Sequence, residues 1–153
     1  MNKIIALHSL KEYRNQYSKY NIVAACGCFD IIHIGHIEYL EGAKGLGDIL
    51  FVGINSDASV IRNKGKRPVF QLMDRLHTIA ALSCVDYVFS FSHKTFSESL
   101  RLLKPDIFAR GTDAEYKSFP EKQLTQALDI KVVKIGEIKR SSSSLLRKYF
   151  EGD

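Results

Sequence analysis

Short apolar runs alternate along the chain with segments in which apolar residues recur at every third or fourth position. The runs predict buried strands at residues 22–26, 49–54, 85–89, 107–109 and 131–135. The periodic segments predict helices at about 9–19, 35–46 and 72–80, from near Thr95, from Pro120, and at about 143–150. Because strands and helices alternate, we expect an α/β fold, a Rossmann-like doubly wound parallel sheet of about five strands with helices on both faces.

Local patterns locate several of the element ends. Ser9 with Glu12, and Thr95 with Glu98, each match a helix capping box. Glycines 45 and 47 fit the end of the helix at 35–46. A run of basic residues predicts an exposed loop closed by Pro68, with Arg62, Lys64, Lys66 and Arg67 in it.

The composition fits a single globular domain over residues 1–153. The chain is 45% hydrophobic and 25% charged, and at this length it can bury one core. The three cysteines, Cys26, Cys28 and Cys84, are an odd number, which does not indicate a disulfide framework. Only one residue separates Cys26 from Cys28, which is poor spacing for a structural zinc pair, so we expect small buried thiols. No stretch reaches the ~20 apolar residues of a membrane helix, and the N-terminus lacks a signal-peptide core. We expect a cytoplasmic protein with no membrane partner.

The charge balance suggests an anionic ligand without identifying it. Lys and Arg number 22 against 17 Asp and Glu, which leaves a net charge of +5. Such an excess suits a nucleotide as well as a nucleic acid, and it also fits a plain basic surface. The basic residues are not interleaved with aromatic ones and no nucleic-acid-binding motif is visible, so we expect no nucleic acid partner.

The segment from Cys26 to His36, between a predicted strand and a predicted helix, carries the most chemistry. Gly27 allows a ligand to approach the backbone, and the helix after Gly35 directs free N–H groups at the loop, as in phosphate sites. His33 and His36 are three residues apart and can face the same side. Two imidazoles there suit nucleotidyl transfer, in which positioned donors and a metal ion stabilise the charge that grows on the phosphates.

These residues resemble a known signature. Gly27-Cys28-Phe29-Asp30 with His33-Ile34-Gly35-His36 is similar to the motif of the cytidylyltransferase-like nucleotidyltransferases. The His-Xaa-Gly-His element also occurs in class I aminoacyl-tRNA synthetases, but the chain is too short for one. Within the superfamily the chain most resembles the adenylyltransferases of ADP-heptose synthesis, over segments 43–48, 55–60, 64–69 and 104–113.

The resemblance implies roles for individual residues. The catalytic candidates are His33, His36 and Lys44, which would hold the phosphates. The nucleotide-binding candidates are Gly27, Cys28, Phe29, Asp30, Gly35, Arg75, Gly111, Asp113, Ser142, Ser143 and Ser144. The acceptor-binding candidates are Asn55, Asp57 and Lys64. Asp30 would orient the loop or help place the metal, and no protein residue is assigned as a metal ligand.

The resemblance further implies Mg²⁺ bridging the phosphates of a nucleoside triphosphate, ATP being favoured, and a homodimer. The acceptor would be a phosphorylated sugar such as heptose 1-phosphate, and pyrophosphate would be released. Arg140 in place of a glycine, Met73 in place of an acidic residue and Thr112 within a Gly-Gly-Asp-like turn depart from the family and affect base or acceptor choice. Two alternatives stay open: a CTP-dependent enzyme acting on glycerol 3-phosphate or a similar phosphorylated alcohol, and a non-catalytic nucleotide- or nucleic-acid-binding module. Taken singly, Lys44, Asn55, Asp113 and the serine run also fit ordinary helix, turn and capping roles.

Overall fold

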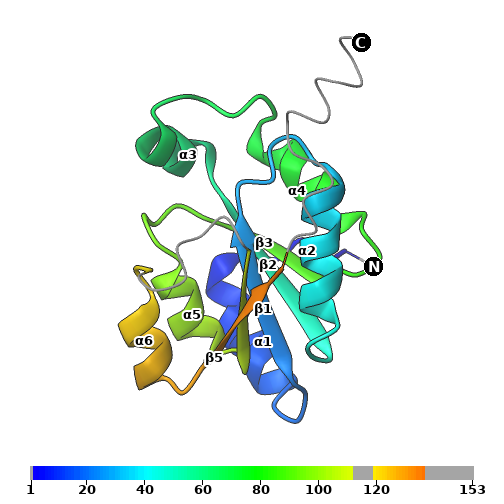
Figure 1. Ribbon diagram of the computed structural model, residues 1–153, viewed down its shortest axis with the longest axis vertical. Helices are drawn as coiled ribbons and strands as arrows, with labels where there is room; N and C mark the ends of the chain where they lie inside the picture. Colours follow the sequence, from blue (N-terminus) through cyan, green and yellow to red (C-terminus); the bar gives the residue numbers. More distant parts are fainter. Residues whose placement is uncertain (1, 112–118, 137–153) are drawn as a thin grey trace.

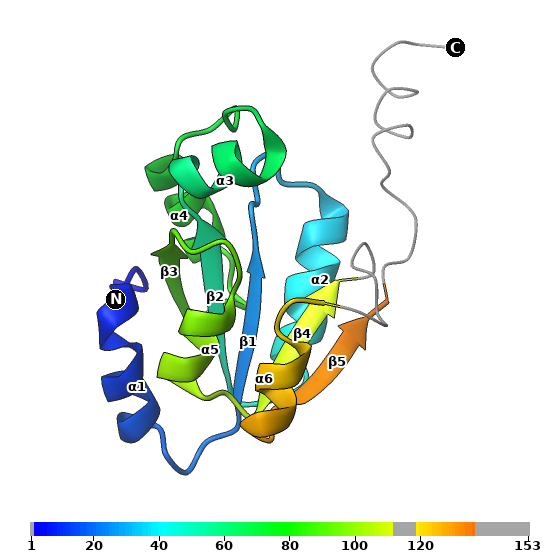
Figure 2. The same ribbon diagram turned by 90° about the vertical axis from the view of Figure 1, so that its left-hand side faces the viewer.

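One parallel five-stranded sheet forms the centre of the molecule, in a computed structural model that describes residues 2–111 and 119–136. The strands are β1 (Ile22–Gly27), β2 (Ile49–Asn55), β3 (Tyr87–Phe91), β4 (Ile107–Gly111) and β5 (Lys131–Ile135). Their order across the sheet is β3-β2-β1-β4-β5, which is read from left to right in Figure 2, turned by 90° from the view of Figure 1. The expected Rossmann-like parallel sheet is confirmed.

Helices cover both faces of this sheet (Figure 2). They are η1 (Leu7–Ser9), α1 (Leu10–Gln16), α2 (Ile34–Lys44), α3 (Asp57–Lys64), α4 (Leu72–Ala80), α5 (Ser97–Leu103) and α6 (Lys122–Ala127). Ile22 and Ala24 of β1 pack into the core beneath α1 and α5, whereas Val23 and Ala25 pack beneath α2 and α4. Because successive side chains of a strand point to opposite faces, a central strand buried on both sides reads as a continuous apolar run.

Two predicted segments need correction. The third strand spans Tyr87–Phe91, two residues later than expected. The first part of the predicted basic loop, with Arg62 and Lys64, belongs to the helix α3, whose N-cap hydroxyl on Ser56 accepts from the Ser59 N–H at 3.2 Å. Gly65, at φ 74°, ends this helix in the left-handed conformation that glycine adopts readily. The sequence pattern does not indicate this helix because few of its residues are buried, and its basic residues are typical of an exposed loop.

Neither predicted capping box forms. The Ser9 hydroxyl donates to the carbonyl of Ala6 instead of accepting from the helix. At the start of α5, the Phe96 N–H donates to Oε1 of Glu121, which lies 25 residues away in the sequence. Oγ1 of Thr95 accepts from the Ser97 N–H at 3.4 Å, so the start of α5 is held by this local bond together with the distant Glu121. The predicted helix at about 143–150 lies outside the described residues.

The strand order determines where a ligand can bind. The chain leaves β1 towards β2 on one side, and β4 lies on the other side of β1. In sheets of this kind the loops after two such strands diverge, and a crevice opens at their carboxyl ends. No helix in the described part of the chain is long and apolar enough to cross a membrane.

Candidate active site

A cavity of about 430 Å³ opens at the carboxyl ends of β1 and β4, where the sheet predicts a crevice. Its lining residues come from the end of β1, the following loop, the start of α2, the end of α3 and the end of β4. They are Cys26, Gly27, Cys28, Phe29, Asp30, His33, His36, Tyr39, Lys64 and Gly111. The fold thus brings eight of the predicted site residues to one cavity, all of the lining set except Cys26 and Tyr39.

The two histidines cap α2 reciprocally. Nδ1 of His33 accepts from the Gly35 N–H at 3.0 Å, and the His33 N–H donates to Nδ1 of His36 at 3.2 Å. The ring centroids are 4.0 Å apart. A nitrogen that accepts a hydrogen bond carries no proton, so each neutral ring has its proton on Nε2. The helix start therefore fixes the tautomer of both rings and leaves Nε2 as the donor nitrogen of each.

Phe29 shapes the loop between β1 and α2. It has a φ of 50°, which is rare for a bulky residue, and yet its side chain is buried. Its ring meets that of His36 edge-on at 5.6 Å and lies nearly parallel to that of Tyr39 at 6.5 Å. A Cβ on Gly27 would come within 3.0 Å of the Phe29 ring, so only glycine fits there without a shift. Such backbone strain is typical of functional loops.

Asp30 fastens this loop to a second one. Its two carboxylate oxygens accept from the N–H groups of Val69 and Phe70, both at 2.8 Å. Residues 69–70 lie in the connection from α3 to α4, and Lys64 at the end of α3 lines the cavity. These bonds hold the loop after β1 to the connection before α4, and the role of Asp30 in placing a metal or nucleotide stays a prediction.

Burial keeps two titratable side chains of the cavity lining, Tyr39 and Cys26, in their uncharged forms. The Tyr39 hydroxyl donates to the carbonyl of Ala109 at 2.7 Å, and burial raises the pKa of Tyr39 above its ordinary value. Burial, with a smaller contribution from Glu121, also raises the pKa of Cys26 to about 12, while Arg110 opposes the shift. Cys26 is therefore a thiol at neutral pH and not a nucleophile.

Sequence reasoning did not single out Tyr39 or Arg110. Tyr39 follows His36 by three residues on α2, a spacing that could have placed its ring beside the histidines. Arg110 precedes Gly111 at the end of β4, and its guanidinium carbon lies 4.1 Å above the centre of the Phe119 ring. No local pattern pairs those two residues, which are nine positions apart in the sequence.

Lys44 lies outside the cavity, so its predicted catalytic role is corrected. α2 starts at the carboxyl edge of the sheet and runs back towards the amino edge. Lys44 is thus about 12 Å along the helix from His36, at a rise of about 1.5 Å per residue. Its Nζ donates to Oδ2 of Asp86 at 2.7 Å and to the carbonyl of Asp48 at 2.6 Å.

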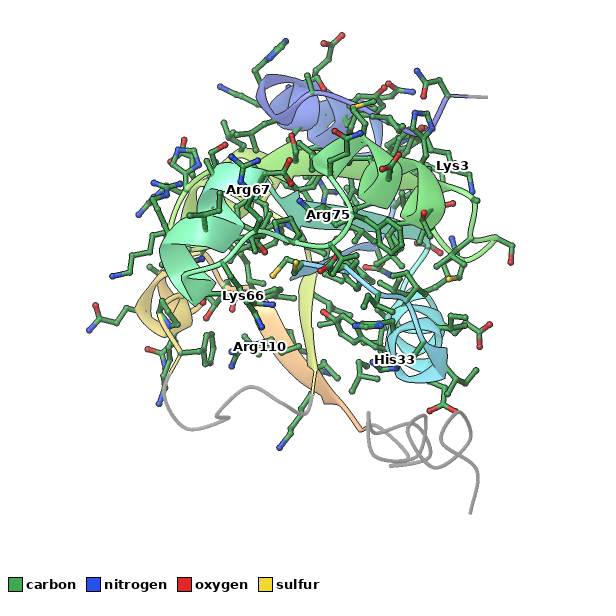
Figure 3. All side chains as sticks on the ribbon, turned by 90° about the horizontal axis from the view of Figure 1, so that it is seen from above. Lys3, His33, Lys66, Arg67, Arg75 and Arg110 are labelled. Carbon is green, nitrogen blue, oxygen red and sulfur yellow. The ribbon has the colours of Figure 1, made fainter. Side chains whose placement is uncertain are left out.

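Arg75 lies behind the cavity-lining loop, where its Nη1 donates to the carbonyl of Cys28 at 2.9 Å, and its predicted place beside the phosphates stays a prediction. Its side chain, labelled in Figure 3, is only 1% exposed. It donates to protein acceptors, including Asp57 at 2.6 Å. Asn55 donates from Nδ2 to the Ser59 hydroxyl at 3.1 Å. Acceptor binding by Asn55 and Asp57 stays a prediction. Asp113, Ser142, Ser143 and Ser144 lie outside the described residues.

A magnesium ion would find few protein ligands here. Among the described residues no three His, Cys, Asp or Glu side chains gather in a way that could hold a metal ion. Asp30 is the carboxylate of the described cavity lining, and each of its oxygens keeps an unused lone pair beside its amide partner. Mg²⁺ usually binds through one or two carboxylates plus substrate phosphates and water, so this lining fits an ion carried by a nucleotide.

Comparison with known proteins gives consistent matches. The Cytidylyltransferase-like family model matches residues 24–149. The bifunctional protein HldE of Helicobacter pylori strain Shi470 is 51% identical over 112 residues, which are 72% of this chain and 24% of that protein. The bifunctional protein HldE of Citrifermentans bemidjiense is 38% identical over 149 residues, 96% of this chain and 30% of that protein. The chain thus spans about a quarter to a third of the length of these relatives.

Solved structures extend the likeness. The lipopolysaccharide core biosynthesis protein of Thermoplasma volcanium GSS1 has a TM-score of 0.68 and 35% identity, covering 78% of this chain and 99% of that one. Pantoate-beta-alanine ligase of Francisella tularensis has a TM-score of 0.67 at 17% identity, covering 94% of this chain and 69% of that one. The second match concerns the fold alone.

Proposed function

The chain belongs to the cytidylyltransferase-like family, and from this premise we propose that it is a nucleotidyltransferase. In this proposal it transfers a nucleoside monophosphate from a nucleoside triphosphate, ATP being favoured, to a phosphorylated sugar such as heptose 1-phosphate. The observation that carries the proposal is the reciprocal cap of His33 and His36 inside the cavity at the ends of β1 and β4. The HldE relatives and the lipopolysaccharide core biosynthesis protein support the choice of a sugar acceptor.

The geometry supports a direct transfer. A phosphate oxygen of the acceptor attacks the α-phosphorus and forms a new P–O bond. The bond from the α-phosphorus to the oxygen it shares with the β-phosphate breaks, and pyrophosphate leaves with that electron pair. Negative charge grows on the oxygens of the α-phosphate and of the leaving group, where Nε2–H donors of His33 and His36 and the positive end of α2 stabilise it. Lys64, an exposed residue that lines the cavity, adds a positive charge.

Magnesium has a limited place in this proposal. When bound, Mg²⁺ neutralises phosphate charge and holds the triphosphate in one conformation. The nucleotide phosphates would supply most of its ligands, and Asp30 is the carboxylate available to it. The orientation of Asp30 is set by Val69 and Phe70, so the same residue would tie the ion to the loop.

The test is a matrix of substrates. Pyrophosphate release is followed with ATP, CTP, GTP or UTP, each paired with heptose 1-phosphate or glycerol 3-phosphate, in the presence of Mg²⁺. We expect turnover with ATP and heptose 1-phosphate, and its loss in His36→Ala. Turnover confined to CTP and glycerol 3-phosphate would assign the chain to the cytidylyltransferase alternative. Nucleotide binding without turnover in any pair would leave a binding module and refute the enzyme proposal.

We also propose a homodimer and a cytoplasmic location, where nucleotides and sugar phosphates are found. A groove of about 490 Å³ beside α3 carries Arg67 and Asp74, and Val69 at its rim is 71% exposed. In a two-fold contact Arg67 of each copy can face Asp74 of the other, and the apolar rim is buried between them. Light scattering after size exclusion should give twice the mass of the chain, and Val69→Asp should give the monomer mass. A wild-type monomer at micromolar concentration refutes the dimer.

A further inference from the structure

Arg75 on α4 is a buried cation whose hydrogen bonds converge on the active-site loop. Nε donates to the carbonyl of Phe70 at 2.9 Å, and Nη1 donates to the carbonyls of Cys28 at 2.9 Å and Asn55 at 2.8 Å. Nη2 pairs with the Asp57 carboxylate at 2.6 Å. We call this set of bonds the Arg75 network. It joins the ends of β1 and β2, the start of α3 and the loop before α4.

The network acts on the strained part of the loop. The Cys28 carbonyl belongs to the peptide group that leads into Phe29, the residue with φ 50°. Holding that carbonyl fixes the orientation of the peptide, and with it the direction in which the Phe29 ring leaves the backbone. The ring packs edge-on against His36 at 5.6 Å. A continuous set of contacts thus leads from Arg75 to the histidine pair.

Asp30 reinforces the same connection from the other side. The Phe70 peptide region is held twice, since its N–H donates to Asp30 and its carbonyl accepts from Arg75. The segment from Cys28 to Asp30 is therefore tied to the Phe70 loop at both of its ends. A planar guanidinium can reach carbonyls in several directions at once, whereas a lysine ammonium on a flexible stem cannot reproduce that fork.

We propose that Arg75 is a positioning residue for His33 and His36, and not a ligand of the nucleotide phosphates. Its role in turnover rests on the proposed function, but its effect on the histidines does not. A phosphate ligand needs exposed donors, and this guanidinium is 1% exposed and already bonded to protein acceptors. Burying its charge is costly, and the Asp57 pair offsets that cost.

The test compares Arg75→Lys and Arg75→Met with Arg101→Met, which removes an exposed arginine of α5 that, within the described part of the chain, pairs with Glu98. Arg75→Lys keeps the charge opposite Asp57 and should stay folded even where the methionine variant does not. The first readout is the ¹⁵N chemical shifts of the His33 and His36 imidazoles, with thermal unfolding as a check on the fold. We expect those shifts to move in Arg75→Lys and to stay at wild-type values in Arg101→Met.

The second readout separates positioning from phosphate binding. We expect kcat to fall on the order of 10²-fold in Arg75→Lys, as for a small misplacement of catalytic groups. The Kd values for ATP and for AMP should each change less than about threefold. A folded Arg75→Lys protein with unchanged imidazole shifts overturns the proposal. So does a Kd for ATP that rises much more than that for AMP, since that result identifies a phosphate ligand. If the shifts move but the wild-type protein turns over no substrate pair, the positioning role holds and the proposed function fails.

Discussion

Charged side chains form hydrogen bonds with backbone groups at both edges of the sheet, where the strands begin (the amino edge) and where they end (the carboxyl edge). These bonds have different structural roles at the two edges. At the amino edge three carboxylates each accept an N–H within one residue of the start of a strand: Asp48 from Asn21, Asp86 from Leu50 and Asp106 from Ile22. At the carboxyl edge Asp30 and Arg75 bond to loops instead. Charges at the amino edge thus hold regular structure in place, whereas those at the carboxyl edge hold an irregular cavity open.

Backbone conformation differs in the same way. Lys104 and Asp129 have φ values of 46° and 55°, and they are exposed residues at turns after helices on the amino side. Phe29, at φ 50°, is buried at the carboxyl edge between Gly27 and the histidines. A residue in the left-handed conformation costs little conformational free energy at an exposed helix end. A buried aromatic residue keeps this conformation only where the surrounding structure holds it there. The comparison teaches that in this protein strain and buried charge gather where chemistry is proposed.

The largest effect should come from the carboxyl edge. In His33→Ala the loss of one Nε2–H donor should lower kcat by roughly 10²–10³-fold. The loss of the cap to Gly35 should cost only about 1 kcal/mol of the free energy of unfolding. Steady-state pyrophosphate release and urea unfolding measure the two quantities separately. If His33→Ala lost stability but kept its kcat, His33 would have only a structural role, and the contrast between the two edges would fail.

The next effect concerns stability at the amino edge. Asp106→Ala leaves the buried Ile22 N–H without its acceptor and removes the carboxylate that pairs with Arg14. The free energy of unfolding should fall by roughly 1–3 kcal/mol while kcat of the folded enzyme stays at the wild-type value. Asp106→Asn, which keeps an acceptor oxygen, is the matched control and should lose less. Equal losses in the two variants would mean that the hydrogen bond to Ile22 is not what matters.

Alkaline pH offers a third comparison between the edges. Burial raises the pKa of Cys26 from 9.0 to about 12, so above pH 9 the folded protein keeps a proton that the unfolded chain loses. The free energy of unfolding therefore falls between pH 9 and 12, by up to about 1.4 kcal/mol per pH unit from this group. In Cys26→Ala the decline should be shallower, as shown by urea unfolding at pH 8, 9.5 and 10.5.

Cys84→Ala is the control for the thiol at the amino side. Its pKa is also raised by burial, but the thiol is less deeply placed than that of Cys26. Its removal should therefore flatten the pH dependence less than the removal of Cys26. If Cys84→Ala flattened the pH dependence more than Cys26→Ala, the thiol of Cys26 in the cavity wall would not be the more strongly desolvated of the two.

The smallest effect is expected for Lys44→Met. The pair with Asp86 is about one-third exposed on both sides, so solvent screens it. Asp86 keeps its hydrogen bond from the Leu50 N–H. The free energy of unfolding should fall by no more than about 1 kcal/mol, with kcat unchanged. A loss of activity without a loss of stability in this variant would restore Lys44 to the active site and break the contrast between the edges.

The sheet was predictable because its central strands are buried on both faces. Ile22 to Cys26 and Ile49 to Ile54 are apolar at nearly every position, which few other structures explain. α3 was missed because Ser59 and Val60 are its buried residues, so no apolar stripe marks it. The Thr95–Glu98 pattern misled because Glu121, far along the chain, takes the capping role at Phe96.

The sequence alone determined the motif and its neighbours. Gly27 to His36 lie in one short connection, so their meeting at the end of β1 follows from local geometry. Only the tertiary structure decided where the basic residues lie and which groups they bond to. Lys64 lines the cavity because Asp30 bonds to the connection after α3. Lys44 lies at the opposite edge because α2 is long, and it bonds there to the Asp48 carbonyl. Arg75 is buried and donates to backbone carbonyls. A side-chain type and its spacing define what a residue can bond to, but the partner it finds depends on segments distant in the chain.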